Sequence, residues 1–170
     1  MKKFIPIIAL LVFALVGCSP SDVDTGVEST DSDTEAVAEK SDSEKRFKAN
    51  ESSEVLGVKI NIAEIVIKPD RIEVGMNLEN TNSDQISWFP DQEGKAIVGD
   101  KQLNANMFMG DSIGGEVAGG VKQNGVLVFL ANNKDKIDPN AIKELKLDLG
   151  EIMSGDFTKT EKVEFNIKVK

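Results

Sequence analysis

The sequence has no histidine, no tyrosine and a single cysteine among its 170 residues. Without histidine, the chain cannot activate a serine or cysteine nucleophile through an imidazole base, and it cannot bind zinc or haem iron through imidazole. A single cysteine excludes an intramolecular disulfide, a thiolate metal cage and a CxxC redox pair. These absences argue against an enzyme, and we expect no catalytic residue, no bound metal and no cofactor.

The chain has little positive charge, with 20 Lys and Arg residues against 29 Asp and Glu residues and a formal net charge of −9. A nucleic-acid-binding surface needs clustered basic side chains, so we expect no nucleic-acid partner. The negative charge is concentrated in residues 19–46, which carry nine acidic and three basic side chains. Residues 47–170 are only mildly acidic, with 20 acidic and 15 basic side chains.

Residues 1–18 have the organisation of a targeting segment. Two lysines precede an apolar run over residues 4–16, which is too short to cross about 30 Å of hydrocarbon as a permanent helix. The run ends in Leu15-Val16-Gly17-Cys18, which resembles the lipobox of bacterial lipoproteins. This resemblance implies cleavage after Gly17 and a lipid on Cys18 that anchors the protein in the cell membrane, facing the extracytoplasmic side. An ordinary secretory signal with a chance cysteine and an uncleaved anchor helix are the alternatives.

The chain is therefore expected to have three parts. Residues 1–17 form the signal peptide, residues 18–50 comprise the lipidated cysteine and a disordered acidic tether, and residues 51–170 form a folded domain. The tether contains mainly Ser, Asp, Thr and Glu, and its few apolar side chains cannot offset the entropy lost on ordering. It serves either as a solvated spacer or as an acidic attractant for cations or a basic partner.

Alternating apolar and polar residues indicate β-strands throughout residues 51–170. The clearest alternation covers residues 72–78 and is typical of an antiparallel strand with one buried face. In the preceding strand the apolar parity changes between Ile62 and Ile65, which predicts a bulge near Ala63-Glu64. Asp138-Pro139 predicts one short helical turn that reaches about Lys143. Further strands are expected at residues 86–89, 95–98, 101–104, 125–130, 145–149 and 163–169.

The pattern predicts an all-β fold, an antiparallel β-sandwich of seven to eight short strands with at most one short helical turn. Residues 72–82, residues 115–129, and residues 142–149 with 163–169 resemble the small immunoglobulin-like domain of Gram-positive lipoproteins and secreted immunogenic proteins. The resemblance implies an immunoglobulin-like sandwich and an extracytoplasmic binding module without an agreed catalytic activity. The chain lacks the cysteine pair of immunoglobulin domains.

Met107, Phe108 and Met109 are a candidate partner contact, because methionine and aromatic side chains adapt to partner surfaces. They lie beside a glycine-rich loop, and strand alternation predicts that at least one of them points into the core. Trp88 is expected to pack in the sandwich core, with a surface anchor for a ligand as the alternative.

The loop from Asn132 to Asp138 has oxygen ligands that could bind a hard cation such as Ca²⁺. It lacks the glycine and the bidentate glutamate of an EF-hand loop, so we favour a polar loop in which Asp138 caps a helical turn.

Two functions remain open. The first is a membrane-anchored, non-catalytic binding or protein-interaction module at the cell surface, with an envelope or extracellular protein as its partner. The second is a small-ligand or ion sensor that is accessory to a transporter. The sequence does not select between them.

Overall fold

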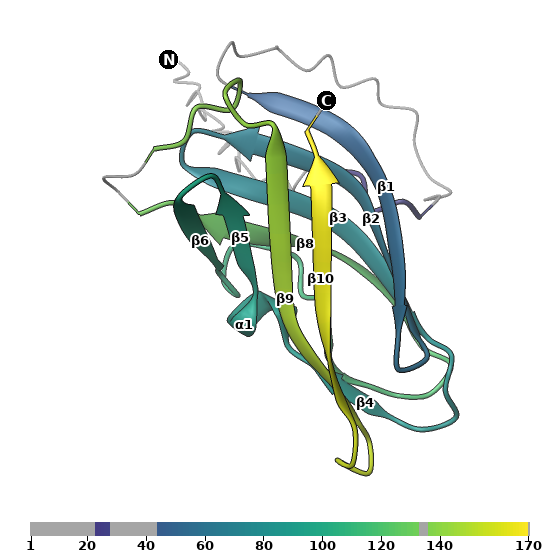
Figure 1. Cartoon of the computed structure of the whole chain (residues 1–170). Coiled ribbons are helices and arrows are strands. Elements are labelled where there is room, and N and C mark those ends of the chain that lie inside the picture. Colours follow the sequence, from purple (N-terminus) through teal and green to yellow (C-terminus); the bar gives the residue numbers. More distant parts are fainter. Residues whose placement is uncertain (1–22, 28–43, 133–135, 170) are drawn as a thin grey trace, which may run out of the picture.

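The computed structural model describes residues 23–27, 44–132 and 136–169, and ten strands and one short helix lie among them (Figure 1). The elements are β1 (Lys45–Val55), β2 (Val58–Lys68), β3 (Arg71–Asn80), β4 (Ile86–Trp88), α1 (Pro90–Glu93), β5 (Lys95–Val98), β6 (Lys101–Ala105), β7 (Gly115–Val117), β8 (Lys122–Leu130), β9 (Glu144–Ser154) and β10 (Thr160–Lys168). The prediction of an all-β fold with at most one short helical turn is confirmed. The strands are ten in the described part of the chain, rather than seven or eight.

The strands form one antiparallel sheet that folds over into two layers (Figure 1). The sheet order is β1-β2-β3-β8-β6-β5-β9-β4-β7, and β10 pairs with β9 outside this path. One layer contains β1, β2, β3 and β8, whereas β5, β9 and β10 belong to the other. β6 connects the layers, because it pairs with β5 along its length and with the end of β8 through Asn104 and Ala105. The molecule is therefore sandwich-like, with its core between the layers.

Strands β2 and β3 show how the sequence pattern produces the buried face. In β3 the apolar residues of the alternating series are all buried in the core. In β2 the pairing register with β3 shifts between Ile62 and Glu64, which confirms the predicted bulge. The bulge keeps Ile62 and Ile65 on the inner face although they are an odd number of residues apart.

Trp88 is packed in the core, as predicted. Its side chain is fully buried, and its indole Nε1–H donates a hydrogen bond to the carbonyl oxygen of Leu149 at 2.8 Å. The bond joins β4 to β9 and satisfies the polar atom of an otherwise apolar side chain. Trp88 is thus a packing residue and has no exposed face for a ligand.

The predicted helical turn at Asp138 is wrong. Residues 139–141 form a turn, in which the Ala141 N–H bonds to the Asp138 carbonyl oxygen and the Asp138 carboxylate accepts the N–H of Asn140. The short helix instead begins at Pro90, directly after Phe89. A proline fits the first helical position because its missing N–H has no partner there in any helix.

Strand β1 begins at Lys45, inside the range expected to be tether. β1 pairs with β2 alone and contributes only a few apolar side chains to the core, among them Phe47 and Val55. Its sequence therefore shows only weak apolar alternation. Residues 23–27, coloured purple in Figure 1, also lie in that range. They contact the outer face of β2, β3 and β8, where Val23 is buried against Val66, Val126 and Val128.

Candidate functional site

Met107, Phe108 and Met109 lie on the loop between β6 and β7, beside the middle of β8. Asn106 connects this loop to the sheet, because its N–H donates to the carbonyl oxygen of Val128 at 2.8 Å. The Asn106 side-chain oxygen then accepts the N–H of Phe108 at 2.9 Å, which closes an Asx-type turn. The three side chains are therefore carried by a backbone turn that is hydrogen-bonded to a central strand.

All three side chains point toward solvent. Phe108 is 86% exposed, and Met107 and Met109 are each 50% exposed. The prediction that at least one of them enters the core is wrong, because the segment forms a turn and strand alternation does not apply to it. Ile113, farther along the same loop, is buried in the core instead. The structure thus presents one phenylalanine between two methionines as an exposed apolar surface.

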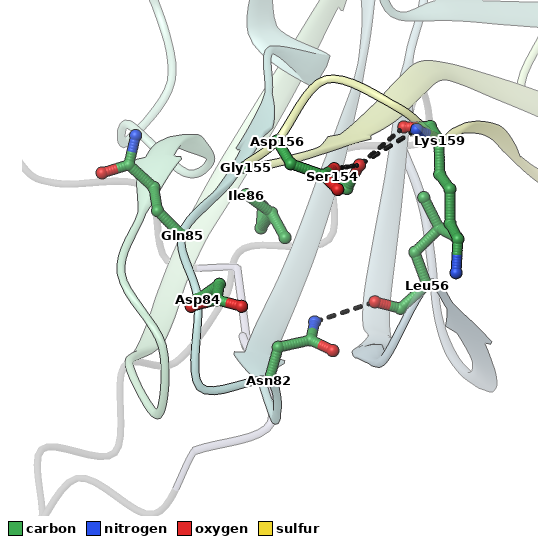
Figure 2. Close-up of a pocket in the computed structure, with 9 residues that line it drawn as sticks. All are labelled: Leu56, Asn82, Asp84, Gln85, Ile86, Ser154, Gly155, Asp156 and Lys159. Atoms are coloured by element: carbon green, nitrogen blue, oxygen red, sulfur yellow. Dashed lines mark hydrogen bonds between the residues drawn. The ribbon is translucent and has the colours of Figure 1, made fainter.

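A second candidate site is a pocket at the end of the sandwich where β1 turns into β2 and β9 turns into β10 (Figure 2). Its volume is about 650 Å³. Three chain segments that are distant in sequence line it: Leu56 from the β1–β2 turn, residues 82–86 before and at the start of β4, and the β9–β10 turn with Lys159. We call this end of the molecule the loop end.

Asn80 joins these segments, although it does not line the pocket itself. The residue is fully buried, and its Nδ2 donates to the carbonyl oxygens of Asp84, Val117 and Ala118 at 2.9, 3.0 and 3.2 Å. Its Oδ1 accepts the N–H of Asn82 at 3.1 Å. A single amide therefore holds the β3–β4 loop against the segment that follows β7, which preorganises one wall of the pocket.

Asn82 connects that wall to the opposite turn. Its Nδ2 donates to the carbonyl oxygen of Leu56 at 2.8 Å, which is the lower dashed line in Figure 2. The hydroxyl of Thr81 donates to the neighbouring carbonyl of Gly57 at 2.7 Å. The β1–β2 turn and the β3–β4 loop are thus fixed relative to each other by side-chain-to-backbone bonds.

The β9–β10 turn supplies the remaining wall. Ser154 donates to the Asp156 carboxylate at 2.6 Å, and Thr158 donates to the same carboxylate through its N–H and its hydroxyl. These donors lower the pKa of Asp156 to about 2, with the Ser154 hydroxyl the largest cause. Asp156 is therefore charged at every ordinary pH but is engaged within its own turn.

Asp84 and Lys159 are the charged groups of the pocket that remain open to a ligand. They lie on opposite sides of it, one on the β3–β4 loop and the other on the β9–β10 turn (Figure 2). Neither side chain forms an ion pair with the residues that the structure describes. Ile86 and Leu56 add apolar surface, so the pocket offers one carboxylate, one ammonium group and an apolar wall.

Phe157 follows this pocket wall at the tip of the β9–β10 turn. It is 73% exposed and adopts a left-handed backbone conformation with φ of 59°. Left-handed positions favour glycine or asparagine, and a phenylalanine there is uncommon. Phe157 is therefore an exposed apolar side chain next to the pocket, separate from the Met107–Met109 turn.

Two predicted sites fall partly or wholly outside the described residues. Cys18 and the lipobox precede Val23, and residues 133–135 of the suggested cation loop are likewise not described. Within the described residues, no group of three or more Asp, Glu, His or Cys side chains converges as a metal site would require. Nor do these residues include a helix long and apolar enough to cross a membrane.

The pocket was not predicted from the sequence. Its lining residues are ordinary turn residues, and only tertiary hydrogen bonds over long sequence separations bring them together. One sequence signal exists: Asn80-Thr81-Asn82 ends the stretch of residues 72–82 that carries the family resemblance, and the side chains of these three residues make the connecting bonds.

Comparison with known proteins identifies structures of similar fold and assigns no function to the chain. No family model matches the chain, and no curated protein matches it. A functionally unknown protein from Listeria monocytogenes EGD-e has a similar structure, with a TM-score of 0.51 at 8% identity over 75% of this chain and 88% of that one. A conserved hypothetical protein from Bacillus anthracis gives a TM-score of 0.44 at 11% identity, over 71% of this chain and 97% of that one. The similarity to the Listeria protein concerns the fold alone.

Proposed function

We propose that the protein is a lipid-anchored extracytoplasmic lipoprotein that acts as a non-catalytic protein-interaction module at the cell surface. The observation that supports this most strongly is the exposed turn of Met107, Phe108 and Met109. A phenylalanine that is 86% exposed between two half-exposed methionines is costly to leave in water and gains free energy when a partner covers it.

The turn is built in a way that suits recognition. Its backbone is fixed to β8 through Asn106 and Val128, so little backbone entropy is lost when a partner binds. The methionines are flexible and polarisable, and they can adjust to the partner surface around the rigid phenylalanine. An aromatic anchor surrounded by adaptable side chains is the usual composition of a binding hot spot.

The membrane anchor rests on the lipobox resemblance. A diacylglyceryl group on Cys18 supplies at least two acyl chains, and two chains are what stable anchoring requires. Replacing Cys18 by serine removes the thioether, so the variant should leave the membrane fraction or persist as an unprocessed precursor. Unchanged membrane attachment and unchanged mobility in this variant would contradict the anchor.

The contact surface is tested by formaldehyde crosslinking in intact cells that produce the full chain. Wild type should yield a discrete crosslinked complex, and Phe108→Ser should lose it without a change in protein level or membrane attachment. Phe157→Ser is the matched control, because it also removes an exposed phenylalanine from a turn. Equal crosslinking by wild type and Phe108→Ser would overturn the role of this turn.

The pocket at the loop end favours a second candidate, a small-ligand or ion sensor accessory to a transporter. Asp84 and Lys159 on opposite walls suit a ligand that carries both an ammonium and a carboxylate group, such as an amino acid or a short peptide. Such a ligand should raise the melting temperature of wild type by mass action, and Asp84→Asn or Lys159→Gln should abolish the increase. An amino-acid and dipeptide panel that leaves the melting temperature unchanged would exclude this ligand class.

A further inference from the structure

Residues 23–27, which we call the strap, lie flat against the outer face of the layer formed by β1, β2, β3 and β8. This face is apolar at its centre, where Val66, Val126 and Val128 point away from the core. Val23 covers these three residues and is itself only 6% exposed. The strap therefore fills a place on the sheet that would otherwise expose an apolar patch to water.

The strap also forms polar contacts with side chains on this surface. The N–H of Asp24 donates to the buried carboxylate of Glu64 at 2.9 Å, and the Asp24 carboxylate pairs with Lys48 at 2.7 Å. One step farther along, the Asn77 amide donates to the carbonyl oxygen of Thr25 at 2.8 Å. Lys48 from β1, Glu64 from β2 and Asn77 from β3 thus each form a hydrogen bond with a different atom of the strap.

Gly75 makes the close approach possible. It lies in β3 beneath the strap, and a Cβ built at this position would overlap the carbonyl oxygen of Asp24. The backbone of Gly75 is not in the left-handed region, so its own conformation does not require glycine. The need for a small residue here comes from the strap alone.

We propose that the strap is a docking element that holds the sandwich close to its lipid anchor and turns the loop end away from the membrane. This inference rests on the lipid at Cys18 that the proposed function includes. Residues 23–27 are then a second attachment between the anchor and the domain, in addition to the covalent connection at Glu44.

The docked strap shortens the reach of the domain. Val23 is the fifth residue after Cys18, and five residues of extended chain span at most about 17 Å. Without docking, the first domain residue is Glu44, which is 26 residues from Cys18 and could lie up to about 88 Å away. Docking therefore converts a long tether into a short one without any change in sequence.

The position of Val23 also sets the orientation of the domain relative to the membrane. Val23 contacts Val66, which is eight residues along β2 from Val58, the start of that strand at the loop end. Eight residues of strand span about 26 Å. The chain enters the sheet far from the loop end, so the anchor lies nearer the β2–β3 turn, and the pocket with Phe157 lies at the distal end.

Docking is tested by hydrogen exchange of the full lipidated chain in detergent micelles. Val23→Ser removes the buried apolar contact, and Val27→Ser is the matched control because Val27 is 50% exposed on the same strap. The amides of Asp24 and Gly26 should exchange about tenfold faster in Val23→Ser than in Val27→Ser or wild type. Equal exchange in all three proteins would overturn the docked strap.

The orientation is tested by energy transfer to an acceptor lipid in vesicles of phosphatidylethanolamine and phosphatidylglycerol. A donor dye is attached to a cysteine introduced at Asp100 or at Phe157, because the sulfur of a lipidated Cys18 is blocked. Asp100 lies in the β5–β6 turn, at the same end of the sandwich as the β2–β3 turn: Lys101 donates to the Lys136 carbonyl oxygen, and the next residue, Ile137, donates its N–H to the carbonyl oxygen of Pro69. Transfer should be stronger from position 100 in wild type and Val27→Ser, and the difference should shrink in Val23→Ser.

Equal or reversed transfer in the membrane-bound wild type would overturn the orientation. A wild-type chain recovered without lipid on Cys18 would overturn the anchor and the orientation together. The exchange of Asp24 and Gly26 separates these failures, because it reports strap docking whether or not the chain is lipidated.

Discussion

The carbonyl oxygen of Asp24 lies directly over Gly75, in the space that a side chain at that position would occupy. Gly75 is in the middle of β3, where a glycine costs stability because it has no side chain to pack. The cost is offset by contacts of the strap, since the absent Cβ lets residues 23–27 lie against β2, β3 and β8.

Gly75→Ala should release the strap and leave the sandwich folded. The added methyl group meets the Asp24 carbonyl, whereas alanine is as acceptable as glycine to the extended backbone of β3. Brief digestion with a protease that cleaves at aspartate should cut at Asp24 in the variant. The same site should stay uncut in wild type. A large loss of melting temperature with no new cleavage would contradict this account of Gly75.

The strap should also respond to pH through the Asp24–Lys48 pair. The hydrogen bond from Lys48, followed by the N–H of Gly26, lowers the pKa of Asp24 below 3.8, and Asp24 in turn raises the pKa of Lys48 above 10.5. Other charged groups face Asp24 as well: Glu64 on β2 accepts its N–H and is paired with Arg46 on β1.

The two shifts act at opposite ends of the pH scale. A lowered carboxyl pKa contributes docking stability that is present above pH 3.8 and is lost as pH falls through the lowered value. A raised lysine pKa contributes stability that is present below 10.5 and is lost as pH rises through the raised value. The amide chemical shift of Gly26 should therefore change at acid pH, and Asp24→Asn should flatten that acid transition. A transition that persists in Asp24→Asn would assign the effect to another group.

Asn80→Asp should destabilise the domain strongly, although aspartate has nearly the same shape as asparagine. It replaces an amide that donates to the carbonyls of Asp84, Val117 and Ala118 with an oxygen that can only accept. Leaving these groups without a donor should lower the free energy of unfolding by about 1–3 kcal/mol or more, measured by urea denaturation. Asn166→Asp, at an exposed position of β10, is the control and should change it by less than about 0.5 kcal/mol. Equal stability of the two variants would contradict the structural role of Asn80.

Trp88 should contribute to stability through both its volume and its N–H. Trp88→Ala should cost about 3–5 kcal/mol because it leaves a cavity in the centre of the core. Trp88→Phe keeps most of the packing but leaves the Leu149 carbonyl without its donor, at a cost of about 1–3 kcal/mol. Circular dichroism is the suitable probe, because both variants remove the only tryptophan. Phe108→Ser serves as the exposed control, and a comparable loss from it would contradict the packing assigned to Trp88.

The inner face of the fold could be predicted because it depends on local alternation. The parity change between Ile62 and Ile65 was sufficient to locate the bulge, and the isolated tryptophan was correctly assigned to the core. The outer face could not be predicted in the same way. The nearly continuous apolar run over residues 125–130 is typical of a central strand, but nothing near it in sequence identified Val23 as the residue that covers Val126 and Val128.

The candidate sites illustrate the same limit. The structure shows that the Met107–Met109 side chains are exposed, and this exposure depends on Asn106, whose side chain closes a turn where alternation had implied a strand. The pocket depends on Asn80 reaching Val117, which is 37 residues away. Contacts of that range are decided by the packing of whole loops, so the identities of neighbouring residues do not reveal them.

The most direct test of the proposed interaction places a photoreactive amino acid at position 108 of the full chain in intact cells. As a control, the same group is placed at position 166 on the exposed face of β10. We predict one discrete adduct of higher mass from position 108 in the membrane fraction and none from position 166. No adduct from position 108, or the same adducts from 108 and 166, would contradict a protein partner bound through Phe108.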